Sequence, residues 1–264
     1  MKISVQGMIP YLRDNSISDK ILVYDSLDST NEYAKKLARS EAGHGTIVIA
    51  ESQTSGKGRH GRKFFSPPGH GIYMSMILHP RKHRLDPALT TPFAAVAVCE
   101  AIEAVSGSEP RIKWVNDVFI DGKKVCGILA ESVTDPNIPG YQLIILGIGI
   151  NFSCPETGFP DSLHQVAGAI FTSSTSVTRD RLAAEVANRI LSPQSTHSEN
   201  QIIEKYRARL LMLGKKIMVA GSDESYEATA IDIDDSGRLI VQKETGETVS
   251  LFSGEISIRG ALTT

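Results

Sequence analysis

Short apolar runs separated by polar turns dominate the first part of the chain and predict β-strands. Runs with the length and β-branched composition of strands occur at 21–25, 46–50, 71–78 and 141–150. The run at 46–50 reads TIVIA, a continuous β-favouring stretch, as expected for a strand that is buried on both faces. These runs predict a β-sheet built from segments that are distant in sequence.

Apolar residues at helical spacing predict helices between these strands. The first helix begins near Ser29, because Glu32 follows three positions later and the pair fits a capping box. A long apolar helix is predicted from 88 to 105, since Asp86 supplies an N-cap and Pro87 suits the first helical position. The mixture of strands and helices indicates an α+β fold.

The stretch from 151 to 178 is rich in Pro, Gly, Ser and Thr and is predicted to be loop or short turns. Apolar residues at helical spacing then predict two helices, at 182–190 and 202–210. Gly214 is predicted to end the second of these helices.

The segment between the long helix and the apolar run at 141–150 predicts a strand and a hairpin. Residues 111–115 have strand character, 116–117 interrupt it, and 118–120 resume it. The dipeptide Asp121-Gly122 is a strong signal for a two-residue hairpin turn leading into a strand at 124–131.

The last part of the chain predicts a separate small barrel. Short strands divided by Gly-containing turns are expected at 216–219, 226–231, 238–241 and 248–251. We therefore expect two domains, at 1–213 and 214–264.

Composition narrows the class of protein. The chain has 264 residues, of which 41% are hydrophobic and 22% charged, as in ordinary globular proteins. The net charge of -2 gives no overall attraction to nucleic acid. The sequence carries no signal-peptide pattern, and no apolar run approaches the roughly 20 residues of a membrane span. We expect a cytoplasmic protein with no membrane partner.

Three cysteines stand apart from one another and from histidine. Cys99, Cys126 and Cys154 form no CxxC pair, so they do not predict a zinc site. Buried, reduced thiols are the expected state in a cytoplasmic protein. No metal site is predicted from side chains.

The stretch 53–68, QTSGKGRHGRKFFSPP, has the composition of an anion site. It combines backbone-permissive glycines with the cations Lys57, Arg59, Arg62 and Lys63, and with His60 when that ring is protonated. Glycines and like charges also predict a loop that is mobile when empty and closed by ligand.

Two common nucleotide motifs do not fit this loop. Gly56, Gly58 and Gly61 match G-x-G-x-x-G, but the Rossmann motif requires a helix directly afterwards. Pro67 and Pro68 prevent that helix. A Walker motif is excluded because no Gly lies five positions ahead of a Gly-Lys-Ser/Thr triplet.

Five ordered motifs together resemble the catalytic domain of the biotin protein ligases, and a sixth resembles the signature of their C-terminal domain. The motifs are DSTN at 28–31, GKGRHGR at 56–62, KWVND at 113–117, KVCGIL at 124–129, GIGIN at 147–151 and GEISIR at 254–259. The chain departs from the common pattern at Lys57, where the family usually has Arg, and at Val115, where it usually has Pro. The Lys57 change replaces a bidentate fork by a point charge.

The resemblance implies a fold and an activity. The expected fold is a class II synthetase-like mixed sheet with flanking helices, followed by an SH3-like barrel. The expected reaction joins biotin and ATP into biotinyl-5′-AMP and then transfers biotin to a lysine of a biotin carboxyl carrier protein. Mg²⁺ is expected with ATP. About 20 residues precede the first predicted strand, so we expect the single-function type without DNA binding.

The resemblance also implies which residues form the site. Catalytic roles are expected for Lys124, Asp117 and Arg59, with Asp117 orienting the incoming amine. Biotin binding is expected for Ser29, Thr30, Asn31, Gln53, Lys57, Gly58, Arg59, Lys124 and Gly127. ATP binding is expected for Arg59, Arg62, Phe64, Lys113, Asn116, Asn151 and Arg259.

Several alternatives remain open from the sequence. Ser29, Thr30 and Asn31 also suit simple helix capping, and Lys124 also suits a solvated turn. A lipoate ligase or transferase performs similar carboxyl activation, although the loop together with KWVND favours biotin. A nucleic-acid binder would need a longer basic run than this loop offers. Members of the family pair sheets side by side, so the resemblance is compatible with dimerisation through an exposed strand edge, but composition does not decide between monomer and homodimer.

Overall fold

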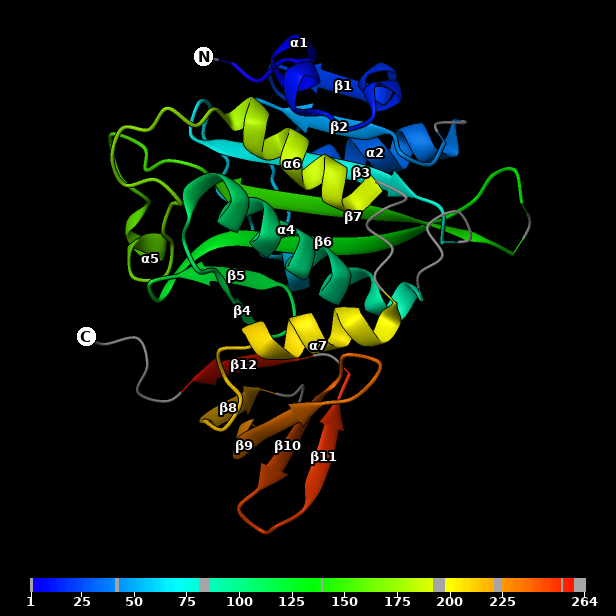
Figure 1. Ribbon diagram of the computed structural model, residues 1–264. Coiled ribbons are helices and arrows are strands. Elements are labelled where there is room, and N and C mark those ends of the chain that lie inside the picture. The colour runs from blue at the N-terminus through cyan, green and yellow to red at the C-terminus, as the bar shows by residue number, and fades with distance from the viewer. Residues whose placement is uncertain are drawn as a thin grey trace.

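A seven-stranded sheet forms the larger part of the molecule (Figure 1). The computed structural model describes residues 2–40, 43–80, 86–138, 140–191, 198–220, 225–252 and 254–258. The sheet consists of β1 (Ile21–Tyr24), β2 (Ile47–Ala50), β3 (Gly71–Leu78), β4 (Arg111–Lys113), β5 (Asp117–Ile120), β6 (Lys123–Thr134) and β7 (Gln142–Asn151). Its order is β1-β2-β3-β7-β6-β5-β4. Only β1 and β2 pair in parallel among these neighbours, so the sheet is mixed, as expected.

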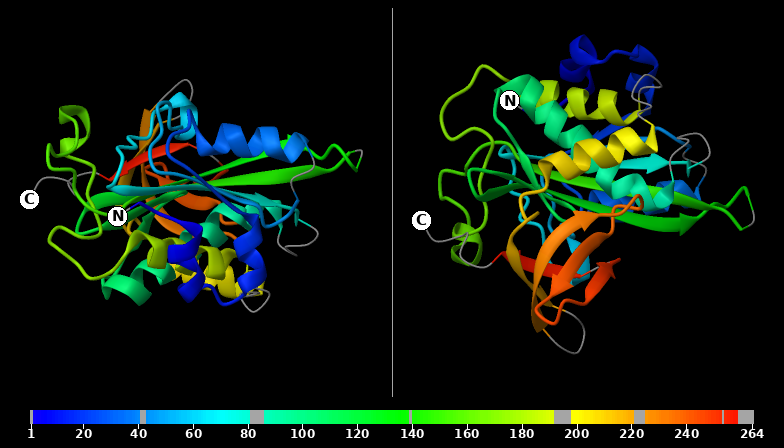
Figure 2. Two further views of the ribbon diagram at one scale, coloured as in Figure 1. Left: turned by 90° about the horizontal axis from the view of Figure 1, so that it is seen from above. Right: turned by 60° about the horizontal axis from the view of Figure 1, so that its bottom comes forward.

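Helices cover both faces of this sheet. On one face, α2 (Thr30–Arg39) packs Ala34 and Ala38 against β2, β3 and β7. On the other face lie α4 (Thr90–Ser106), α6 (Arg179–Leu191) and α7 (Glu199–Arg209) (Figure 2). The short helix α1 (Val5–Met8) packs beside α6 on this second face, and α5 (Asp161–His164) lies in the long loop after β7. Burial on two faces explains the uninterrupted apolar character of β2 and β3.

The long apolar helix is α4, and its ends follow the sequence signals. Asp86 caps a 3₁₀ turn at Pro87–Leu89 by accepting a hydrogen bond from the amide of Ala88, and α4 then runs to Ser106. Gly107 ends it with φ 69°. Residues 87–106 together have the length and hydropathy of a membrane span, which the apolar-run argument missed. Two-thirds of that stretch is buried inside the protein, so its hydropathy is explained by the core.

A second sheet of five antiparallel strands follows α7. It consists of β8 (Lys216–Ala220), β9 (Ser225–Ile233), β10 (Leu239–Lys243), β11 (Thr248–Leu251) and β12 (Glu255–Ile258), in the order β11-β10-β9-β8-β12. The small barrel-like sheet was expected, but β12 was not recognised as a strand. The sheet lies against the β4 end of the main sheet and α7 (Figure 1).

Three local predictions were wrong. Ser29 occupies the N-cap of α2, but its side chain makes no capping hydrogen bond. Gly214 does not end α7, which stops at Arg209 because Leu210 is extended. Residues 118–120 do not resume β4, since the chain reverses and β5 pairs antiparallel with it. This reversal places Lys113 opposite Asp117.

The cysteines follow the expectation in part. Cys99 and Cys126 are buried free thiols, and burial raises the pKa of Cys99 to about 12. Cys154 is exposed, contrary to the prediction, because it lies in the loop after β7.

Trp114, the single tryptophan, joins the two sheets. Its side chain is buried, and its Nε1 donates a 3.0 Å hydrogen bond to the carbonyl of Gly237 in the turn before β10. Next to it, the amide of Leu211 donates to the carbonyl of Ile112 at 3.0 Å. The C-terminal sheet is therefore fixed directly to the β4–β5 turn.

Replacing Trp114 by Phe should loosen this junction. The Gly237 carbonyl would lose its donor, which costs about 1–3 kcal/mol of the free energy of unfolding. Hydrogen exchange should then accelerate in β8–β10 more than in β3 and β7. Unchanged exchange across residues 216–243 would show that Trp114 does not hold the C-terminal sheet.

Candidate active site

A cavity of about 580 Å³ lies where the ends of several strands meet the C-terminal sheet. Its walls come from the start of α2, the loop 53–65, the β4–β5 turn, β6, β7, the α5 region and the C-terminal sheet. Fifteen of the sixteen predicted site residues have a described position, and all fifteen line this cavity: Ser29, Thr30, Asn31, Gln53, Lys57, Gly58, Arg59, Arg62, Phe64, Lys113, Asn116, Asp117, Lys124, Gly127 and Asn151. Arg259 lies outside the described residues.

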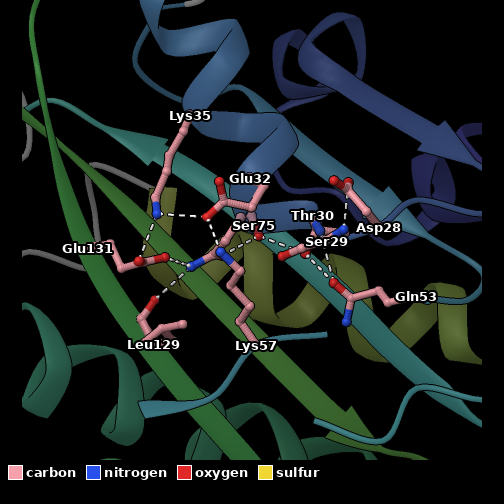
Figure 3. Close-up of polar contacts among 11 residues, drawn as sticks. Asp28, Ser29, Thr30, Glu32, Lys35, Gln53, Lys57, Ser75, Leu129 and Glu131 are labelled. Carbon is pink, nitrogen blue, oxygen red and sulfur yellow. Dashed lines mark hydrogen bonds and ion pairs between the residues drawn. The ribbon is translucent and has the colours of Figure 1, made fainter. Parts of the chain in front are cut away.

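The start of α2 supplies neutral hydrogen-bonding groups. Gln53 Oε1 accepts from the amide of Thr30 at 2.9 Å and lies 3.2 Å from its hydroxyl, and Gln53 Nε2 donates to Ser66 at 2.9 Å. The Ser75 hydroxyl, buried in β3, lies 2.8 Å from the Thr30 hydroxyl and 2.6 Å from Asn31 Oδ1 (Figure 3). This wall is held by interlocking side chains, so its polar atoms have fixed directions.

The Gly-rich loop folds back on itself as a compact hairpin. Its two arms pair through the amide of Phe64 with the carbonyl of Gly56 at 2.9 Å, and through Gly58 with Arg62 at 2.7 Å. The tip is a 3₁₀ turn in which His60 has φ 54° and Gly61 has φ 73°. The tight reversal explains why glycines are spaced so closely here.

The β4–β5 turn brings an amide and a guanidinium together. Asn116 is fixed to β6 by two hydrogen bonds with Ile128, one from its side chain at 2.9 Å and one to its carbonyl at 3.0 Å. Its Oδ1 accepts from Arg59 Nη1 at 3.2 Å. The turn therefore positions Arg59 of the loop over the cavity.

Lys124 and Asp117 form an ion pair inside the cavity. Lys124 Nζ lies 2.7 Å from Asp117 Oδ1, and both side chains are about a quarter exposed. The Lys124 backbone is held separately, because its amide donates to Val166 at 2.7 Å and its carbonyl accepts from Gly168 at 2.9 Å. Lys124 is thus a fixed cation in the site and not a solvated turn residue.

Glycines in β6 and β7 make room for the side chains above them. A Cβ at Gly149 would lie 2.6 Å from the Phe64 ring, and a Cβ at Gly127 would lie 3.3 Å from the same ring. A Cβ at Gly147 would collide with Asn31. The motif GIGIN therefore encodes a smooth cavity floor on which Phe64 and Asn31 rest.

Replacing Gly149 by Ala should displace Phe64 and with it the closed loop. Overpacking a site of this kind costs about 1–3 kcal/mol, so the KM for the small-molecule substrate should rise about tenfold or more. Gly43→Ala is the matched control, because a Cβ there meets no atom within 4 Å. Equal KM values for the two variants would contradict this role for Gly149.

The α5 region and the C-terminal sheet also contribute to the cavity wall, which no motif in the sequence predicted. Apolar side chains at the cavity wall include Phe159, Leu163, Val166, Met218 and Ile256. The sequence KIMVA of β8 predicts a strand with a buried face. It does not predict which part of the protein lies against the other face.

Lys57, the residue that departs from the family pattern, forms an ion pair with a protein carboxylate. Its Nζ lies 2.7 Å from Glu32 Oε1, which also accepts from Lys35 at 2.9 Å. Hydrogen bonds from Lys57 and then Lys35 lower the pKa of Glu32 to about 2. A lowered pKa means that the ion pairs contribute stability above pH 4.5 and lose it as pH falls through about 2. The contact is therefore constant across neutral pH.

The described residues hold no group of three or more His, Cys, Asp or Glu side chains that could bind a metal ion. Asp117 is the one carboxylate among the described residues of the cavity wall. This donor set fits a Mg²⁺ ion that arrives on phosphate oxygens and takes at most one protein carboxylate.

Comparisons with known proteins agree over most of the chain. Residues 23–151 match the Biotin/lipoate A/B protein ligase family, and residues 212–259 match the Biotin protein ligase C terminal domain. The chain is 30% identical to the biotin--[acetyl-CoA-carboxylase] ligase of Mycobacterium tuberculosis over 266 residues, which covers 94% of this chain and 96% of that protein. It is 32% identical to the bifunctional ligase/repressor BirA of Bacillus spizizenii, covering 94% of this chain and 76% of that protein.

A solved structure shows the same architecture. The biotin protein ligase from Aquifex aeolicus in complex with biotin and ATP superposes with a TM-score of 0.75 and 27% sequence identity. The match covers 90% of this chain and 98% of that one, so both sheets have counterparts there.

Proposed function

This chain belongs to the biotin protein ligase family, and we propose that its cavity activates biotin with ATP and passes it to a biotin carboxyl carrier protein. In the first step the biotin carboxylate attacks the α-phosphate, which forms biotinyl-5′-AMP and releases pyrophosphate. In the second step a carrier lysine amine attacks the acyl carbonyl and AMP leaves. The family membership makes the chain an ATP-dependent biotin ligase.

The observation that carries the assignment is that the cavity wall has a neutral end and a separate charged part. Thr30 and Gln53 present fixed neutral hydrogen-bonding groups at one end. Arg59 and the Lys124–Asp117 pair form the charged part of the wall. A ureido ring needs the first kind of group, and a carboxylate meeting a phosphate needs the second.

We assign biotin to the neutral end. Ser29, Thr30, Gln53 and Gly58 surround the space for the ureido ring. We assign the valeryl chain to the part of the cavity beside Gly127, where the floor carries no side chain. Asn31 would act here through its orientation, because its amide is occupied by protein partners.

Catalysis is assigned to charge neutralisation and alignment. Two anions must meet in the first step, and Arg59 and Lys124 lower the repulsion between them. Asp117 would orient the carrier amine and accept its proton in the second step. It lies 2.7 Å from Lys124, so its carboxylate stands beside the cation assigned to the reacting groups.

The nucleotide is assigned to the cationic half of the cavity. Arg62 and Lys113 would face phosphate oxygens, while Phe64, Asn116 and Asn151 border the remaining space. Arg259 is proposed to reach the nucleotide as well. Mg²⁺ would be held by the ATP phosphates, with Asp117 within the same cavity, and would supply counter-charge to them.

The two sheets suggest a division of labour. We propose that residues 1–213 form the catalytic domain and 214–264 the C-terminal SH3-like barrel, which closes the cavity through β8 and β12. Free thiols at Cys99, Cys126 and Cys154 suit a reducing cytoplasm, where the protein would act as a monomer or homodimer without binding DNA.

The test is ATP–pyrophosphate exchange with biotin and lipoate measured side by side. Exchange that depends on biotin and is absent with lipoate is expected. Exchange with lipoate alone would replace the biotin assignment by a lipoate ligase or transferase. Salt-dependent retention of DNA without any exchange would favour a nucleic-acid binder.

A further inference from the structure

A chain of alternating charges connects the Gly-rich loop to the neutral end of the cavity. Lys57 Nζ lies 2.7 Å from Glu32 Oε1, and Lys35 Nζ lies 2.9 Å from that same oxygen. Lys35 also lies 2.7 Å from Glu131 Oε1. The other oxygen of Glu131 accepts from Asn31 Nδ2 at 2.9 Å. Figure 3 shows this series running from the loop across the first turn of α2 to β6.

Lys57 is the most exposed member of the series, while Glu131 at its inner end is 29% exposed. The side chain of Lys57 is 47% exposed, Glu32 is 30% and Lys35 is 17%. Burial of Lys35 alone would lower its pKa, but its hydrogen bonds to Glu131 and Glu32 outweigh this and raise the pKa. Lys35 is therefore firmly charged, and the more exposed Lys57–Glu32 ion pair to the loop is the weak link of the series.

Asn31 is oriented by the inner end of the series. Its Nδ2 donates to Glu131 and, at 3.4 Å, to the Leu129 carbonyl, while its Oδ1 accepts from Ser75 at 2.6 Å. The residue is 4% exposed. Its amide cannot turn without breaking these contacts, so Glu131 fixes a wall of the cavity that it does not itself line.

We propose that Glu32, Lys35 and Glu131 are positioning residues for biotin binding, and that the Lys57–Glu32 ion pair holds the loop closed over the neutral end of the cavity. The proposal rests on the ligase function proposed above. It gives Lys57 a role different from the direct contact with biotin that the resemblance implies. The ion pair acts on the population of the closed loop, so it affects the KM for biotin and leaves kcat unchanged.

A double-mutant cycle distinguishes the two roles of Lys57. Glu32→Gln and Lys57→Met should each raise the KM for biotin by roughly three- to tenfold, as expected for a partly exposed ion pair, and the double variant should be no worse than either. Lys57→Arg keeps the charge and should stay near the wild-type KM. Lys36→Met, an exposed residue of the same helix, is the control and should change nothing.

Opposite results overturn the proposal. A direct contact between Lys57 and substrate would make Lys57→Met lower kcat in both backgrounds, while Glu32→Gln alone would have no effect. A further check is the salt dependence of KM. Binding of anionic substrates gives every variant some salt dependence, and loss of the ion pair should make that dependence smaller in Glu32→Gln than in the wild type. Equal salt dependence in both proteins would also contradict it.

A measurement without substrate separates this proposal from the ligase assignment. Chymotrypsin cleaves after Phe64 and Phe65 when the loop opens, and Glu32→Gln should accelerate that cleavage in the ligand-free protein several-fold. Equal cleavage of Glu32→Gln and wild type would refute the closing role. Accelerated cleavage in a protein that shows no biotin-dependent exchange would instead keep the ion-pair role and reject the ligase function.

Discussion

Replacing Lys124 by alanine should lower biotin-dependent pyrophosphate exchange by about 10² to 10³-fold or more while the protein stays folded. The ammonium lies within the cavity on the strand that forms its floor, 2.7 Å from Asp117. Removing it leaves two substrate anions to meet with one fixed positive charge fewer. The fold should survive, because the backbone of Lys124 keeps its bonds to Val166 and Gly168.

Lys123 provides a matched control one position away. Its ammonium contacts the carbonyls of His164 and Gln165, at 3.3 Å and 2.9 Å, and does not line the cavity. Lys123→Ala should retain exchange close to the wild-type rate. Wild-type exchange by Lys124→Ala would refute the assignment.

A second variant separates loss of the cation from repulsion by its former partner. Lys124→Ala leaves the Asp117 carboxylate without this ion pair, and that charge could itself repel the substrates. Adding Asp117→Asn removes the charge. Exchange should stay low in the double variant, and recovery would show that Lys124 serves mainly to neutralise Asp117.

The sequence predicts most of the catalytic scaffold because its signals are local. The strand 71–78 follows from apolar composition, and the turn at Asp121-Gly122 follows from two residues that accept positive φ, here 48° and 73°. The cavity floor follows from a motif in which glycine is required by neighbours, as Gly147 and Gly149 show. The strand and the turn depend on the residue itself and the few beside it. The glycine floor is marked by its motif, but the neighbours that require glycine there, Asn31 and Phe64, are distant in sequence.

The remaining features depend on residues that meet only in the folded chain. Ser29 has the sequence of a capping residue, but its hydroxyl makes no capping bond. Lys57 meets Glu32 from 25 positions away, and nothing in either local sequence predicts that this cation of the Gly-rich loop is paired with a carboxylate. The family pattern identifies the position of Lys57, and only the tertiary structure identifies its partner.

Dependence on tertiary contacts also explains why the sequence did not predict that the C-terminal sheet lines the cavity. Its strands read as a small barrel, yet Met218 and Ile256 line the cavity because Trp114 fixes the sheet against the β4–β5 turn. Trp114 lines the cavity itself, and it also serves the site through this contact with a neighbouring wall. Trp114 holds one wall in place through Gly237.

Asp117→Asn should separate the two half-reactions. Transfer of biotin to the carrier should slow by about 10² to 10³-fold, because asparagine cannot accept the proton of the attacking amine. Adenylate formation should fall much less, within about tenfold, since Lys124 and Arg59 remain. Single-turnover transfer from preformed biotinyl-5′-AMP to a carrier domain measures the second step, and pyrophosphate exchange measures the first.

Asp121→Asn is the matched control for this substitution. Asp121 lies at the far end of the same β5 segment, in the hairpin turn with φ 48°, a conformation that asparagine also adopts readily. It should leave both half-reactions unchanged. If Asp117→Asn transferred biotin at the wild-type rate, Asp117 would be limited to holding Lys124, and the carrier amine would have to lose its proton to another group. If instead the rates of both half-reactions fell equally, the cause would be displacement of Lys124 and not the loss of proton transfer from the amine. Asp117 and Lys124 would then act as one unit in adenylate formation.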